Sequence, residues 1–236
     1  MLRLGKLLSR LPIPLLQALG AILGWLVWLC SSRHRRLLAA NLAQSGLNAP
    51  LSTCITHQGV SALEMFAHWL RPIPDLLPLV TERHGWEHVE AALASRRPLI
   101  FITPHLGALE MSGVCVAGWV DRKMAPLYRP PKQAYLEPLM VASRSRSGAE
   151  PAPANSAGVR ILLRNLKQGG VTFILPDQTP GNGDGVWAPF FGRLAFTMTL
   201  ISRVAVSTDA IILCCHTERL GFSGRYRFSV QPMTGE

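Results

Sequence analysis

The first third of the chain is dominated by one uncharged apolar stretch. Between Arg10 and Arg33 lie 22 residues without a charged side chain, LPIPLLQALGAILGWLVWLCSS. A helix of about 20 apolar residues is long enough to cross a bilayer, and Trp25 and Trp28 near one end suit a membrane interface. We therefore interpret residues 1–32 as an N-terminal membrane anchor helix, which either spans the bilayer or lies on its surface.

Two other interpretations of this stretch stay open. A cleaved signal peptide would need a shorter apolar core and a small-x-small cleavage site, and the sequence offers neither. A buried core helix is favoured by Pro12, Pro14 and Gln17, because these residues weaken a continuous apolar span. Basic residues flank both ends of the stretch, so their distribution does not predict its orientation in a membrane.

Downstream, the apolar positions alternate between helical and strand patterns. Leu63, Phe66 and Leu70 recur at helical spacing and predict a helix over 51–70, which the prolines at 72, 74 and 78 end. The apolar run 97–103 predicts a buried strand. Further helices are predicted over 33–45, 85–95, 111–120, 135–145, 157–168 and 197–207, and further strands over 124–128, 171–176, 209–216 and 225–231. This alternation predicts one α/β domain over residues 33–236, a mixed sheet flanked by helices.

Charge and composition narrow the classes of partner. The net charge is +10, and 48% of the residues are hydrophobic. A basic, apolar protein meets polyanions, either nucleic acid or an anionic membrane surface. The sequence has no zinc spacing, aromatic RNP motif or recognisable helix-turn-helix, so we expect no nucleic-acid partner. Residues 122–167 hold a dense basic set that is either a solvated face or a site for acidic groups: Arg122, Lys123, Arg129, Lys132, Arg144, Arg146, Arg160, Arg164 and Lys167.

The cysteines and histidines carry little signal by themselves. The five cysteines form no C-x-x-C pair, so we interpret them as small core residues in a reducing compartment. His105 has no second histidine four positions later, and nothing else in the sequence assembles three ligands, which argues against a metal hydrolase. The other histidines are interpreted as ordinary surface or core residues: His34, His57, His68, His84, His88 and His216.

The candidate chemistry lies where the predicted strand 97–103 ends, in the stretch T-P-H-L-G-A-L-E. His105 would emerge from the carboxyl end of this strand, where α/β sheets bind ligands. On one ideal helix His105 and Glu110 would lie about 140° apart. With His105 in the loop and Glu110 one turn into the following helix, the two can meet. A carboxylate on one imidazole nitrogen would make the other a base for a hydroxyl proton.

Other interpretations of this stretch are plainer. The spacing of His105 and Glu110 occurs by chance, and Glu110 could simply stabilise the start of a helix. If the stretch is catalytic, an oxyanion would need hydrogen-bond donors, for which we consider backbone N–H groups near Gly107.

Four further stretches follow in order along the chain. They are Y-R-P-P-K (128–132), S-R-S-R-S (143–147), L-P-D-Q-T-P-G (175–181) and G-V-W-A-P-F-F-G-R (185–193). Together with T-P-H-L-G-A-L-E, they resemble the late acyltransferases of lipid A biosynthesis, of the lauroyl- and myristoyl-transferase type. That family lies in the lysophospholipid acyltransferase superfamily, known for an H-x4-D/E motif. The resemblance extends from the N-terminal helix to about Val230.

The resemblance implies a fold, an activity and roles for residues. The fold would be glycerolipid acyltransferase-like. His105 would be the catalytic base and Glu110 its acidic partner. The substrate-binding residues implied by these stretches, with two neighbours that we add, are Arg144, Asp177, Tyr128, Arg129, Arg146 and Gln178. Asp177 could bind the acceptor, hold Arg144 in an ion pair, or simply cap a loop. Phe190 and Phe191 are expected in the core or along an acyl groove.

The resemblance also implies substrates and a location. The donor would be acyl carrier protein, and the acceptor a hydroxyl of a Kdo-bearing lipid A precursor. The reaction would take place on the cytoplasmic face of the inner membrane, with neither a cofactor nor a metal. Two alternatives stay open. The acceptor could be a glycerolipid or an ornithine lipid. The chain could also be a truncated, inactive membrane-anchored homologue, because family members usually continue well past a strand like 225–231.

Overall fold

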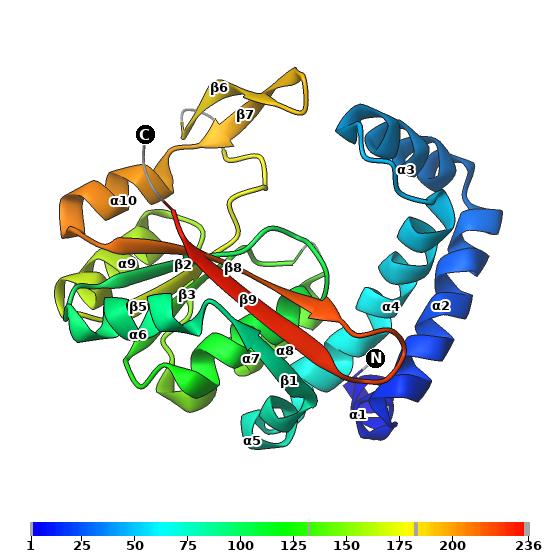
Figure 1. Cartoon of the computed structure of the whole chain (residues 1–236), viewed down its shortest axis with the longest axis horizontal. Coiled ribbons are helices and arrows are strands. Elements are labelled where there is room, and N and C mark those ends of the chain that lie inside the picture. Colours follow the sequence, from blue (N-terminus) through cyan, green and yellow to red (C-terminus); the bar gives the residue numbers. More distant parts are fainter. Residues whose placement is uncertain (1, 132, 182–183, 234–236) are drawn as a thin grey trace.

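The computed structural model describes residues 2–131, 133–181 and 184–233, and it has the predicted α/β architecture (Figure 1). The longer helices are α1 (Leu2–Arg10), α2 (Ile13–Cys30), α3 (Ser32–Ser45), α4 (Leu51–Leu70), α6 (Trp86–Ala94), α7 (Leu109–Trp119), α8 (Glu137–Arg144), α9 (Ser156–Lys167) and α10 (Leu200–Thr208). The short ones are α5 (Ile73–Leu76), η1 (Leu77–Leu79), η2 (Ala134–Leu136) and η3 (Arg146–Gly148).

A seven-stranded mixed sheet forms the centre of the molecule, in the order β1-β9-β8-β2-β5-β3-β4. Its strands are β1 (Val80–His84), β2 (Leu99–Ile102), β3 (Met124–Tyr128), β4 (Ala152–Pro153), β5 (Val171–Ile174), β8 (Ile211–Arg219) and β9 (Tyr226–Pro232). Among the described strand pairs of this sheet, β8–β9 is antiparallel and the others are parallel. The strands β2, β3, β5 and β8 therefore end at the same edge of the sheet, which is where α/β proteins bind ligands.

The central strands are short and buried on both faces. In β2, the sequence Leu-Ile-Phe-Ile is buried throughout. Because side chains alternate along a strand, Leu99 and Phe101 join one core with α7, while Ile100 and Ile102 join a second core with α9. Helices thus cover both faces, and the sheet can hold a loop rigidly at the end of β2.

The N-terminal helices pack on the rest of the chain. Pro12 separates α1 from α2, so the predicted anchor is two helices. α2 lies against α4 (Figure 1) through glycines that allow close backbone approach. A Cβ at Gly24 would lie 2.3 Å from the Ile55 carbonyl oxygen, and one at Gly59 would lie 2.0 Å from the Gly20 carbonyl oxygen.

The other side of α2 is exposed and apolar, with Leu19, Ile22, Leu26 and Leu29 among its residues. Within the described residues, α2 is the one helix long and apolar enough to cross a membrane. Whether it spans the bilayer or lies on it stays a prediction.

Most predicted elements are present, with ends shifted by a few residues. The strands β1, β4, β6 (Gly185–Phe190) and β7 (Arg193–Met198) were not predicted. β6 and β7 form a separate hairpin whose two-residue turn, Phe191-Gly192, has positive φ at both positions. Phe190 and Phe191 are about half exposed there, so the expectation of a core position is wrong. Residues 182–183, which precede β6, lie outside the described part of the chain, as does Lys132.

Candidate active site

His105 is held by Asp177 at two points. The imidazole Nδ1 lies 2.7 Å from one carboxylate oxygen of Asp177, and the backbone N–H of His105 donates to the other at 2.7 Å. His105 follows β2 and Asp177 follows β5, and these strands are parallel neighbours. Because a carboxylate can only accept, it selects the tautomer with the proton on Nδ1. The Nε2 atom is then left as an acceptor.

The side chain of Gln178 completes the contacts of the imidazole. Its Nε2 lies 3.2 Å from Nε2 of His105, and an amide N–H donates to a bare imidazole nitrogen. The imidazole is thus bonded on both nitrogens. A hydroxyl entering the site would have to replace Gln178 as the hydrogen-bond partner of Nε2.

Glu110 does not have the partner that the sequence suggested. Its carboxylate accepts from the Arg144 guanidinium at 3.2 Å, and the two side chains are about one-fifth exposed. Among the described residues, the hydrogen bonds of His105 run to Asp177 and Gln178 rather than to Glu110. From the sequence, Glu110 was considered as the partner of His105 and Asp177 as a partner of Arg144. In the structure, Glu110 pairs with Arg144, and Asp177 bonds His105. The cause is topological, because parallel neighbours β2 and β5 bring their following loops together.

The Arg144 guanidinium also lies over an aromatic ring. Its central carbon is 5.5 Å from the ring centre of Trp69, a cation–π contact. One cation is thus held between a carboxylate and an aromatic face, which fixes a flexible side chain at the cavity wall.

The turn after His105 is fastened to the end of β8. Gly107 has a φ of +62°, and a Cβ there would lie 2.3 Å from the Thr217 carbonyl oxygen. That carbonyl accepts the N–H of Ala108 at 2.8 Å, and the hydroxyls of Thr217 and Ser112 lie 2.8 Å apart. Glycine is therefore required at position 107 for both conformation and space.

A cavity of about 610 Å³ opens beside His105. Its polar lining includes His105, Gln178, Glu110, Arg144 and Arg219. Its apolar lining includes Met65, Trp69, Leu109, Leu127, Leu136, Met140, Leu175 and Met198. A lining that combines charged and apolar side chains suits a ligand that is itself part ionic and part hydrocarbon.

The remaining predicted residues take different positions. Tyr128 and Arg129 line the cavity from the end of β3, and Arg129 also donates to the Thr179 carbonyl at 3.2 Å. Arg146 lies apart from the main cavity, where its guanidinium donates to the carbonyls of Ser143 and Arg71 at 2.9 Å. Within residues 2–131, 133–181 and 184–233, no three His, Cys, Asp or Glu side chains come close enough to share a metal ion.

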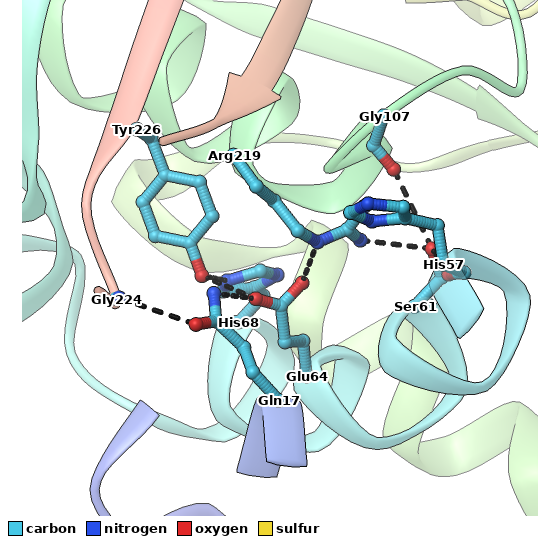
Figure 2. Close-up of polar contacts among 9 residues, drawn as sticks. All are labelled: Gln17, His57, Ser61, Glu64, His68, Gly107, Arg219, Gly224 and Tyr226. Atoms are coloured by element: carbon cyan, nitrogen blue, oxygen red, sulfur yellow. Dashed lines mark hydrogen bonds and ion pairs between the residues drawn. The ribbon is translucent and has the colours of Figure 1, made fainter. Parts of the chain in front are cut away.

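A buried polar network beside the cavity was not predicted from the sequence (Figure 2). The Glu64 side chain is 1% exposed and accepts from Gln17 at 2.6 Å, Tyr226 at 2.8 Å and Arg219 at 2.6 Å. Gln17 is an isolated polar residue in the apolar helix α2, and Glu64 is the one acidic residue of α4; each signals buried hydrogen bonding. Periodicity does not reveal that they bond to each other.

Burial sets the protonation of two further members of this network. Burial lowers the pKa of His68 from 6.5 to about 4, an effect that the nearby Glu64 and Glu110 carboxylates oppose. Burial, followed by the Glu64 carboxylate, raises the pKa of Tyr226, so its hydroxyl keeps its proton and donates to Glu64. His68 Nε2 lies 3.2 Å from the same hydroxyl, and neutral His68 therefore donates to it.

Comparison with known proteins identifies the family. A family described as bacterial lipid A biosynthesis acyltransferase matches residues 1–235. The chain belongs to this family. The resemblance found from the five sequence stretches is thereby confirmed.

Individual relatives are distant. The chain is 25% identical over 148 residues to a lipid A biosynthesis acyltransferase of Haemophilus influenzae, covering 63% of the chain and 46% of the relative. It is 24% identical over 223 residues to the lipid A biosynthesis myristoyltransferase of Escherichia coli K12, covering 93% and 68%. The corresponding palmitoleoyltransferase of Escherichia coli K12 is 27% identical over 150 residues, covering 63% and 47%. The chain thus spans less than half the length of the Haemophilus relative.

Proposed function

We propose that the chain transfers a fatty acyl group from acyl carrier protein to a hydroxyl, or hydroxyacyl, group of a Kdo-bearing lipid A precursor. The observation that carries the proposal is the hydrogen bonding of His105 and its position at the cavity. Its Nδ1 is bonded to a carboxylate, and its Nε2 acceptor faces a part-charged, part-apolar cavity. This arrangement, in a chain of this family, is that of a general base for acyl transfer.

The reaction follows from the two imidazole nitrogens. Nε2 takes the proton of the acceptor hydroxyl while its oxygen attacks the thioester carbonyl. The C–S bond of the tetrahedral intermediate then breaks, and the departing sulfur takes the proton back from the imidazolium. The products are an ester and the free thiol of the carrier. Asp177 holds the ring and stabilises the imidazolium, and base catalysis of this kind contributes about 10²–10⁴-fold.

The oxyanion of the intermediate needs donors. The N–H groups of Leu106 and Ala108 are already bonded to the carbonyls of Pro104 and Thr217. The side-chain amide of Gln178 borders the same cavity, and we assign it this role once the acceptor hydroxyl has taken its place on Nε2.

The acidic groups of the acceptor would meet arginine. Arg144 and Arg129 line the cavity, and guanidinium groups bind phosphate and carboxylate through paired hydrogen bonds. The apolar lining would hold the acyl chain. Glu110 keeps Arg144 oriented, and an entering anion would compete for the same guanidinium. This role replaces the His105–Glu110 dyad in our proposal.

Helix α2 and the net charge support a location at a membrane. The exposed apolar side of α2 supports attachment to a membrane, and the net charge of +10 suits an anionic surface. We propose the cytoplasmic face of the inner membrane, where the acidic acyl carrier protein can reach the site. The reaction as written requires no cofactor.

The test is a mass-spectrometric assay with detergent-purified protein. Acyl carrier proteins loaded with a set of saturated chains are incubated with a Kdo-bearing tetra-acylated lipid A precursor. We expect a mass gain of one acyl group that is lost in His105→Ala. A gain only on a lysophospholipid or an ornithine lipid acceptor would replace the acceptor in the proposal. No gain on any acceptor would support an inactive homologue.

A further inference from the structure

The Glu64 network joins parts of the chain that are far apart in sequence (Figure 2). Gln17 comes from α2, Ser61 and Glu64 come from α4, and Arg219 ends β8. Arg219 donates to Glu64 at 2.6 Å and to the Ser61 hydroxyl at 2.8 Å, with a side chain only 4% exposed. Gln17 donates to Glu64 at 2.6 Å and accepts the Gly224 N–H at 3.2 Å.

This network adjoins the strand end to which the His105 turn is fastened. Thr217, two residues before Arg219, accepts the N–H of Ala108 at 2.8 Å. The Ser61 hydroxyl, which accepts from Arg219, lies 2.9 Å from the His57 carbonyl and 3.5 Å from the Gly107 carbonyl, so its one proton points mainly to His57 and the Gly107 turn lies at the edge of its reach. The turn after His105 is therefore held from β8 on one side and approached from α4 on the other.

A buried ion pair by itself is weak evidence for stability, because desolvation offsets much of its attraction. Here both charged groups have further partners, and the pair adjoins the cavity that His105 also lines. Both carboxylate oxygens of Glu64 are hydrogen-bonded, which offsets the free-energy cost of desolvation. These bonds also hold the side chain in one position.

We propose that Glu64, Arg219 and Ser61 are positioning residues, which hold the His105 turn through the end of β8, and that Gln17 makes helix α2 part of this support. The proposal rests on the proposed function for its kinetic consequence only. It assigns the apolar N-terminal helix a second task besides membrane attachment. A substitution on α2 would thus loosen the position of the imidazole, although α2 itself does not contact the substrate.

The first experiment measures amide hydrogen exchange of the full-length protein in detergent, independently of activity. Because the Ala108 N–H is bonded to Thr217, its exchange reports how firmly the turn is held. Glu64→Gln and Gln17→Leu should speed exchange in peptides covering 105–110 about tenfold, relative to peptides covering β2 and β5. Equal acceleration throughout the sheet would mean loss of global stability, and would overturn the proposal.

The second experiment uses the exposed serine, which can be changed without disturbing the core. Ser61→Ala should lower kcat about threefold to tenfold, with unchanged KM for both substrates and only a small fall in Tm, because Arg219 loses one acceptor and keeps its bond to Glu64. Ser52→Ala is the matched control, because Ser52 is an exposed serine on the same helix away from the cavity. Wild-type kcat in both variants would contradict the role of Ser61.

Failure of the proposed function is distinguishable from failure of this inference. If the wild-type protein transfers no acyl group, the kinetic experiment has no baseline, and the exchange experiment decides alone. If the wild type is active and the exchange near Ala108 is unchanged in Glu64→Gln, the positioning role is excluded while the enzyme proposal stands.

Discussion

The carboxylate of Asp177 bonds both the ring and the backbone of His105, each at 2.7 Å. One side chain therefore fixes the imidazole tautomer and also the loop that presents it. The two hydrogen bonds restrict both the rotation of the imidazole ring and the position of the backbone that carries it. It also makes a clear distinction between the two acids near the cavity, because Glu110 bonds Arg144 instead.

Asp177→Asn should lower kcat of the proposed reaction by about 10²-fold or more, because an amide at this position no longer stabilises the imidazolium. KM should change little. Glu110→Gln should instead raise KM for the lipid acceptor, since Arg144 loses its orienting partner. Steady-state kinetics of the two variants side by side provides the test. The reverse pattern would restore Glu110 as the partner of the base.

Arg144→Lys should raise KM for the acceptor about tenfold. A lysine keeps the charge but loses the planar contact with Trp69 and the paired hydrogen bonds to an anion. Arg160→Lys is the control, because Arg160 is exposed on α9. Equal KM values for the two variants would remove Arg144 from the acceptor site.

Gly24→Ala should lower the free energy of unfolding by about 1–3 kcal/mol, because the new methyl group overlaps the Ile55 carbonyl and separates α2 from α4. Gly113→Ala in α7 is the control. Its Cβ would meet Phe173 at an ordinary 3.8 Å, and alanine favours the helix by up to about 1 kcal/mol. Thermal unfolding in detergent should move in opposite directions for the two variants.

Stability should depend on pH through His68. Its pKa is about 4 when folded and 6.5 when exposed. Between these two pH values the unfolded chain protonates His68 and the folded chain does not. The free energy of unfolding is therefore unaffected by this group above pH 6.5 and falls as the pH is lowered from 6.5 toward 4. For this group alone the loss between pH 7 and pH 5 is about 2 kcal/mol. In His68→Gln, the free energy of unfolding, measured with denaturant, should therefore differ between pH 7 and pH 5 by about 2 kcal/mol less than in the wild type.

The sequence predicted the layers of this fold well, because β2, β5 and α4 carry strong local patterns. It missed the β6–β7 hairpin, since Phe191 is an unusual residue for the first, positive-φ position of the turn, although Gly192 suits the second. The site was predicted in part. His105 and Asp177 were both selected, but their pairing depends on which strands are neighbours, and spacing in the chain favoured Glu110. Glu64 and Arg219 are 155 residues apart, so no local pattern could link them.

The sheet order also bears on how the chain is made. β9 is the last strand in the described part of the sequence, yet it lies between β1 and β8. During synthesis β1 has no neighbour until residues 226–232 have left the ribosome, and Thr217 is equally late in reaching the Gly107 turn. Contacts of such long sequence separation form slowly. The turn that presents the imidazole therefore cannot be held in place until β8, more than a hundred positions further along the chain, has been synthesised.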